Sequence, residues 1–234
     1  MPHADSSLVP SSITSKTEFW AHVHGQLASL LSGQRHWVTN LANASSMVYS
    51  SLLAFTAHFG SGSQAVNWCG ETATHQSRLP SRYDTTIADC NQCALTGFYL
   101  NSSLFPVPRF LGQDGSDNNS AAADASRLLL GPFCGKPACQ FINISPGKAR
   151  GVCADAYLQR RTILVPEVDL YPGHIACDGE TKSEIVCPLI FKKGDKEIML
   201  GVLDLDCLAV SGFCEEDKEG LEKIAALVVS ACDW

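Results

Sequence analysis

Residues 185–206 read IVCPLIFKKGDKEIMLGVLDLD and carry the clearest fold signal in the chain. Two apolar runs of strand length, 185–191 and 197–206, flank the short polar segment KKGDK. Apolar runs joined by a polar turn that contains glycine are typical of a β-hairpin. We therefore predict two neighbouring antiparallel strands here.

Helical periodicity surrounds this hairpin on both sides. Residues 16–33 carry apolar side chains at helical spacing and end at Gly33, which suits a helix C-cap. A second helix is expected near 36–59, and a third from Glu215 to Trp234. The other expected elements are strands at AVNWCG (65–70), GFYL (97–100), LLLGPF (128–133) and RTILVPEV (161–168), and a short helix at 148–160. This order predicts an α+β fold, with a largely antiparallel sheet and its N- and C-terminal helices packed on one face.

The composition limits the classes of protein to consider. The chain has 234 residues, of which 45% are hydrophobic, and a formal net charge of −7. That is enough to build one sizeable core, and the acidic balance argues against nucleic acid or an anionic membrane as a partner. We expect residues 1–15 to form a disordered tail and residues 16–234 to form one domain with insertions at 71–96 and 112–126. The polar N-terminus lacks a signal-peptide pattern, so a cytoplasmic location is expected.

Asp204 and Asp206 in GVLDLD lie two residues apart, and the period of a strand places both on the same face of the sheet. Their neighbours in the strand are apolar. Two carboxylates side by side are costly if they are buried without partners. The pattern leaves two interpretations open: a solvated sheet face or strand end, or a functional site that binds a cation or holds an acid with a raised pKa.

The chain contains eleven cysteines, an odd number, and no export signal, which favours a reducing compartment. Three of them lie in distinctive contexts. Cys177 follows PGHIA, Cys139 ends the turn-rich GPFCGKPAC, and Cys153 lies near the start of the short helix, where the helix dipole favours a thiolate. On local sequence alone, each could equally be a buried structural thiol.

Motifs for other chemistries are absent or incomplete. Cys90 and Cys93 form a CxxC without a second pair of ligands, and we therefore expect no metal site. The sequence has neither a glycine-rich phosphate loop nor a G-x-S-x-G elbow.

Taken together, these segments resemble the free methionine-(R)-sulfoxide reductases, a family built on the GAF fold. The matching strings are LANAS (41–45), NWCG (67–70) joined to GFYL (97–100), LGPFCGKPAC (130–139), RGVC (150–153), PGHIACD (172–178), SEIVCPL (183–189), GVLDLD (201–206) and FCEEDKEGLEKI (213–224). They cover most of residues 16–232 in order. The combination is specific, because a generic GAF domain shares the fold but not the three cysteine contexts.

The resemblance implies a role for each of these residues. Cys177 would match the attacking cysteine, and Cys139 would match the resolving cysteine that forms a disulfide with it. Cys153 would match a third cysteine that assists or forms alternative disulfides. The substrate pocket would contain Trp68, Glu184, Asp204 and Asp206.

Known sulfur chemistry accounts for these implied roles. A thiolate attacks the sulfoxide sulfur, an acid protonates the departing oxygen, and methionine leaves behind a cysteine sulfenic acid. A second thiol condenses with it to a disulfide, which thioredoxin would reduce, so no bound cofactor is expected. Paired carboxylates can bind the ammonium group of a free amino acid. The resemblance also implies a homodimer.

One segment departs from the family pattern, in which the strand reads N-W-x-G-F-Y without interruption. Here residues 71–96 separate Gly70 from Gly97. The segment is either a genuine loop or translated intron sequence, since removing it together with one of the two glycines restores NWCGFYL.

Two other functions remain to be weighed. A non-catalytic GAF module that binds a small ligand would not need the three cysteines. A thiol peroxidase or redox sensor would not need three acids in a pocket. Reduction of free methionine-(R)-sulfoxide is therefore the function that the sequence favours.

Overall fold

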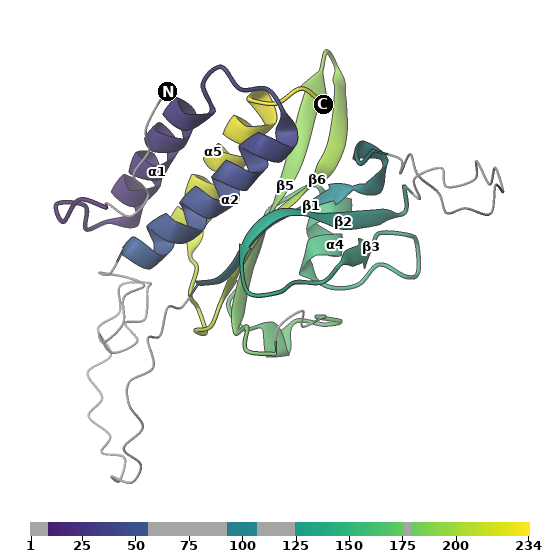
Figure 1. Cartoon of the computed structure of the whole chain (residues 1–234). Helices are drawn as coiled ribbons and strands as arrows, with labels where there is room; N and C mark the ends of the chain where they lie inside the picture. The colour runs from purple at the N-terminus through teal and green to yellow at the C-terminus, as the bar shows by residue number, and fades with distance from the viewer. Residues whose placement is uncertain (1–8, 56–92, 107–124, 176–178) are drawn as a thin grey trace, which may run out of the picture.

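The computed structural model describes residues 9–55, 93–106, 125–175 and 179–234 (Figure 1). Trp68, Cys177 and the expected strand at 65–70 lie outside these ranges, as do residues 1–8 of the expected tail. Within the rest of that tail, Val9 and Ile13 pack against the core. Of the two expected insertions, only residues 93–96 and 125–126 are described.

The described strands form one antiparallel sheet in the order β3-β2-β1-β6-β5-β4. The strands are β1 (Cys93–Asn101), β2 (Arg127–Gly135), β3 (Phe141–Asn143), β4 (Ile163–Val165), β5 (Ser183–Lys193) and β6 (Lys196–Cys207). The predicted hairpin is confirmed as β5 and β6. Their turn contains Gly194 at a φ of 60°, a conformation that glycine adopts without steric cost.

Helices cover both faces of this sheet. Figure 1 shows α1 (Lys16–Leu31), α2 (Trp37–Ala54) and α5 (Glu215–Ser230) together on one side, with α4 (Val152–Gln159) on the other. Two single-turn helices, η1 (Ser102–Leu104) and η2 (Val168–Leu170), complete the described elements. The predicted α+β fold, with the N- and C-terminal helices packed on one face, is therefore confirmed. The helix expected from residue 148 begins only at Val152.

The alternation of side chains along β6 divides the core in two. Leu203, Leu205 and Cys207 point into the larger cluster with α1, α2 and α5. Val202 belongs to the smaller cluster, which α4 covers. Because successive strand residues point to opposite faces, Asp204 and Asp206 share the face of Val202 and lie on the side of α4.

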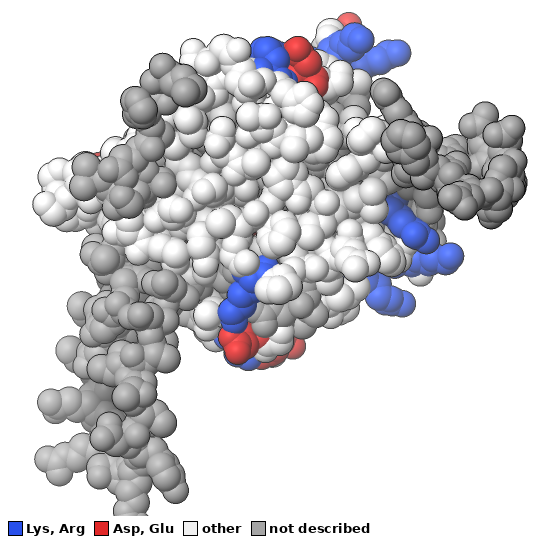
Figure 2. Space-filling model, viewed as in Figure 1, with Lys and Arg blue, Asp and Glu red and all other residues white. Residues whose placement is uncertain are grey.

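The surface over α2 has an unusual composition. No Asp, Glu, Lys or Arg occurs between Trp37 and Ala54, and Figure 2 shows few charged side chains at the centre of this face.

Among the described helices, none is long and apolar enough to cross a bilayer.

Candidate active site

Three carboxyl groups converge on the sheet face under α4. Glu184 of β5 pairs directly with Asp206 of β6, and Asp204 pairs with Val186 on one side and Gly97 on the other. Glu184, Asp204 and Asp206 are only 5%, 5% and 7% exposed. The register of three neighbouring strands thus concentrates negative charge at a buried position.

These acids line one wall of a cavity of about 210 Å³. Cys153 and Gly151 line it at the start of α4, Cys139 lines it from the loop between β2 and β3, and Phe141 lines it from the start of β3. Gly151 has a φ of 84°, and a Cβ atom there would lie 3.6 Å from the backbone nitrogen of Ile175. That distance is an ordinary van der Waals contact, so the positive φ, which L side chains rarely adopt, is what favours glycine at this helix start.

Cys153 lies within this acidic group. Its Sγ is 3.8 Å from Oε1 of Glu184, and the side chain is 7% exposed. Burial raises the pKa of the Cys153 thiol well above its ordinary value, and the negative charges of Asp204 and Glu184 raise it further. The expectation that the helix dipole makes Cys153 a thiolate is therefore wrong, because burial and nearby carboxylates outweigh the dipole.

Asp204 is the acid with the clearest perturbation. Its pKa is raised well above its ordinary value, first by burial and then by the charges of Asp206 and Glu184. Its Oδ1 is buried without a hydrogen-bond partner among the described residues. These conditions favour the protonated carboxyl, which can donate a proton into the cavity.

Cys153, Glu184 and Asp204 also place one ligand atom each within 4.8 Å of one another. That spacing suits a cation in principle. Metal ligation, however, requires deprotonated thiolate and carboxylate ligands, and the raised pKa values of Cys153 and Asp204 oppose this. The donor set therefore fits proton transfer better than metal binding.

His174 approaches the same acidic group from the loop after η2. Its Nε2 lies 3.3 Å from Oε2 of Glu184, and its side chain is 12% exposed. The carboxylate thereby holds the ring at the wall of the cavity. On sequence alone this histidine is more often structural than catalytic, and its contact with Glu184 could not be anticipated.

Two cations face the cavity near the start of α4. Lys148 and Arg150 line it together with the three acids, so the cavity carries positive and negative groups at once. Neither residue was predicted from the sequence to belong to the site. The available signal was the segment KARG directly before the short helix, which places two basic side chains where that helix begins.

Comparison with known proteins of similar sequence and structure shows which family has this arrangement of residues. No family model matches the chain. The free methionine-R-sulfoxide reductase of Saccharomyces cerevisiae is 35% identical over 230 residues, which cover 98% of this chain and 94% of the yeast protein. The chain belongs to the free methionine-R-sulfoxide reductase family.

Solved structures agree with this membership. A structure described as that of the GAF domain is 33% identical, with a TM-score of 0.67 and coverage of 99% of this chain and 97% of the other. The free methionine-R-sulfoxide reductase of Neisseria meningitidis in complex with its substrate is 26% identical, with a TM-score of 0.61 and coverage of 96% and 95%. The resemblance to this reductase family and the GAF-like fold are both confirmed.

Of the seven residues that the family resemblance assigned to the site, the structure brings five together around the cavity. These are Cys139, Cys153, Glu184, Asp204 and Asp206. Cys139 is disulfide-bonded. Trp68 and Cys177 lie outside the described residues.

Leu95 occupies a notable position in this family member. It lies two residues before Gly97, the spacing that the family pattern N-W-x-G-F-Y gives to tryptophan. Leu95 pairs with Asp206 across β1 and β6 and is 3% exposed. In the described β1 strand, a leucine therefore stands beside the acids where the family motif has an aromatic ring.

Proposed function

We propose that this protein reduces free methionine-(R)-sulfoxide to methionine at the cavity under α4. The observation that carries the proposal is the convergence of three buried acids and two cysteines on one small cavity in a chain of this family. In the proposed reaction, the Cys177 thiolate attacks the sulfoxide sulfur. The oxygen is protonated and transferred to Cys177, which becomes a sulfenic acid as methionine leaves.

Asp204 is the proposed proton donor. Burial and the neighbouring carboxylates raise its pKa well above that of an ordinary aspartate, which favours the protonated carboxyl that a general acid needs. Its Oδ1 has no partner among the described residues, so that oxygen is available to a ligand. General acid catalysis by a positioned group typically contributes about 10²–10⁴-fold to a rate.

The size and charge of the cavity support a free amino acid as the substrate. A volume of about 210 Å³ lies below the roughly 300–1,000 Å³ typical of sites for drug-sized ligands. Lys148 and Arg150 could bind a carboxylate, and Glu184 and Asp206 could bind an ammonium group. A zwitterion satisfies both kinds of group at once.

Cys139 is the proposed resolving cysteine. It lines the cavity, and it already forms a disulfide in this structure, which supports a redox role for its sulfur. In the proposed cycle, the Cys139 thiol condenses with the Cys177 sulfenic acid and water leaves. An external dithiol such as thioredoxin then returns both cysteines to thiols, and Cys153 serves as a reserve thiol.

A homodimer is part of the proposal, because the uncharged surface of α2 suits burial against a second copy. Light scattering should then give twice the chain mass. Replacing the exposed Val38 of α2 with lysine should lower that mass towards one chain.

The reaction can be tested by thioredoxin-coupled NADPH oxidation with the separate R and S sulfoxides of free methionine. We expect turnover of the R form alone, lost in Cys177→Ser and kept in Cys134→Ser, a matched change outside the cavity lining. Turnover of peroxide in preference to sulfoxide would replace the proposal with a thiol peroxidase. A folded protein that binds the sulfoxide without turning it over would replace it with a ligand-binding GAF module.

A further inference from the structure

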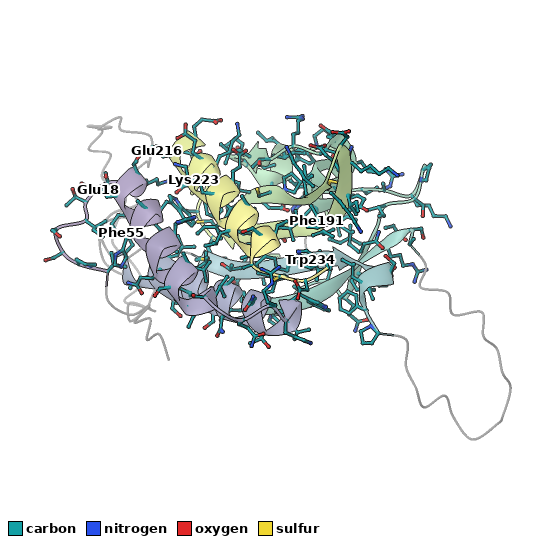
Figure 3. All side chains as sticks on the ribbon, turned by 90° about the horizontal axis from the view of Figure 1, so that it is seen from above. Glu18, Phe55, Phe191, Glu216, Lys223 and Trp234 are labelled. Carbon is teal, nitrogen blue, oxygen red and sulfur yellow. The ribbon has the colours of Figure 1, made fainter. Side chains whose placement is uncertain are left out.

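A second group of reactive side chains lies on the opposite side of the sheet, where α1 and α5 begin. Lys16 is the first residue of α1, and Cys214 is the N-cap of α5. Figure 3 labels Glu18 and Glu216, which mark the same end of these two helices. The Thr17 hydroxyl donates to Glu216 over 3.0 Å, which fixes the two helix starts side by side.

The contact between Lys16 and Cys214 is close and buried. Nζ of Lys16 lies 3.3 Å from Sγ of Cys214, and the residues are 2% and 8% exposed. Cys214 is a thiol rather than part of a disulfide. An amine and a thiol are thus held within hydrogen-bond distance of each other at a buried position.

Asp217 holds this pair in place from the first turn of α5. Its Oδ2 accepts hydrogen bonds from Nζ of Lys16 and from the backbone N–H of Cys214, and its Oδ1 accepts one from Nε1 of Trp20 at 2.9 Å. The carboxylate also provides an acceptor for the lysine proton. Burial lowers the pKa of Lys16, which increases the fraction of neutral, nucleophilic amine.

We propose that Lys16 and Cys214 form a peroxide-sensitive pair that closes into a reversible sulfenamide bond between α1 and α5. In the first step, hydrogen peroxide oxidises the Cys214 thiol to a sulfenic acid and is itself reduced to water. In the second step, the Lys16 amine attacks the sulfenic sulfur, an S–N bond forms, and the S–O bond breaks. The amine proton passes through Asp217 to the departing oxygen, which leaves as water.

The sulfenamide protects the sulfur from further oxidation and remains reducible. One thiol of an external dithiol attacks the sulfur and frees the lysine amine, and the second thiol then releases Cys214. Burial raises the pKa of the Cys214 thiol, so its oxidation is slow and needs sustained exposure to peroxide. This chemistry is independent of the cavity under α4, which lies on the other face of the sheet.

Peptide mass spectrometry of the full chain after peroxide treatment tests the pair directly. Trypsin does not cleave at a blocked Lys16, so the sulfenamide joins the peptides 1–35 and 197–218. We expect this product at the summed mass of the two peptides less two hydrogens, and we expect dithiothreitol to remove it. Fragment ions should place the bond at Cys214 and not at Cys207, which lies in the same peptide.

Three variants complete the test. Cys214→Ser preserves a good helix cap and should abolish the product, whereas Cys207→Ser should keep it. Lys16→Arg preserves a cation beside Asp217 but cannot form this product. The proposal is overturned if Cys214 in the wild type is recovered only as thiol or as oxygen-bearing acids. It is also overturned if the cross-link retains an oxygen atom or persists in Cys214→Ser.

Discussion

Glu184 and Asp206 face each other directly across the β5–β6 ladder, and both are buried. Side chains directly opposite in an antiparallel pair have Cβ atoms about 4.5–5.5 Å apart, and like charges in that arrangement repel. Asp204 lies two residues along β6 on the same face. The sheet register therefore gathers three carboxyl groups in the cavity. Burial first, and then the charges of Asp206 and Glu184, raise the pKa of Asp204.

Replacing Asp204 tests whether this carboxyl group is the proton donor in the reaction. Asp204→Asn keeps the shape of the side chain and removes its acidic proton. We expect kcat with free methionine-(R)-sulfoxide to fall by about 10²–10⁴-fold, the usual contribution of a general acid. Asp195→Asn, in the exposed β5–β6 turn, is the matched control and should leave kcat unchanged. If Asp204→Asn has a kcat within a few-fold of the wild-type value, another group must donate the proton to the sulfoxide oxygen.

The same carboxyl should make stability depend on pH. The folded protein holds a proton on Asp204 at pH values where the unfolded chain has lost it, because the folded pKa is raised. Its contribution to the free energy of unfolding is therefore complete below the unfolded pKa and is lost as the pH rises towards the folded pKa. Urea unfolding at a series of pH values should show a decline in the wild type that is smaller in Asp204→Asn. Identical pH profiles would contradict the raised pKa.

Removing one partner of the buried contact between Lys16 and Asp217 is expected to destabilise the protein. Both residues are nearly inaccessible, and Asp217 also accepts hydrogen bonds from Trp20 and the Cys214 backbone. Removing one partner of a buried pair typically costs about 3–5 kcal/mol, because the other charge is left uncompensated. Asp217→Ala should therefore lower the free energy of unfolding by that amount. Glu219→Ala, an exposed position on the same helix, is the control and should change it by less than about 0.5 kcal/mol.

Close approach of β1 and β6 can be tested at Gly201. A Cβ atom there would lie 2.0 Å from the carbonyl oxygen of Tyr99, so Gly201→Ala must push the two strands apart. Overpacking of this kind costs about 1–3 kcal/mol or more. Gly25→Ala, in the exposed middle of α1 with nothing within 4 Å, should instead stabilise the protein by about 0.5–1 kcal/mol. Thermal unfolding of both variants would reveal opposite shifts, and equal shifts would contradict the strand geometry.

Local patterns in the sequence predicted much of the fold. Helical spacing predicted α1, and the apolar runs around KKGDK predicted the β5–β6 hairpin, because both signals arise within single segments. Strand β3, with only three residues, offered no periodicity to detect. The start of α4 was placed too early, since Gly151 at a φ of 84° ends the preceding segment and lets the helix begin only at Val152.

The site was harder to predict from residues alone. Period two correctly placed Asp204 and Asp206 on one face. The pairing of Glu184 with Asp206 depends on register between strands, and only the family resemblance suggested that they share a pocket. The pKa of Cys153 was expected to fall, because a helix start is visible in sequence, whereas its burial among carboxylates is not.

The segment between Gly70 and Gly97 leads to a final prediction. Deleting residues 71–97 joins Gly70 to Phe98 and restores NWCGFYL, so that Trp68 stands two residues before the strand glycine. In the present chain that position belongs to Leu95, which pairs with Asp206. We expect the deletion variant to fold. Its β1 strand keeps its residues from Phe98 onwards, and residues 67–70 take the place of the strand residues that precede Phe98.

The indole of Trp68 would then pack against the sulfur end of the substrate, and such sulfur–aromatic contacts contribute about 0.3–1.5 kcal/mol. The KM for free methionine-(R)-sulfoxide should fall by up to about tenfold, which corresponds to about 1.4 kcal/mol. The matched control is the same deletion with Trp68→Leu, which returns a leucine to that position and should restore the higher KM. If the two deletion variants share one KM, the ring has no part in binding and the gain comes from shortening the chain alone.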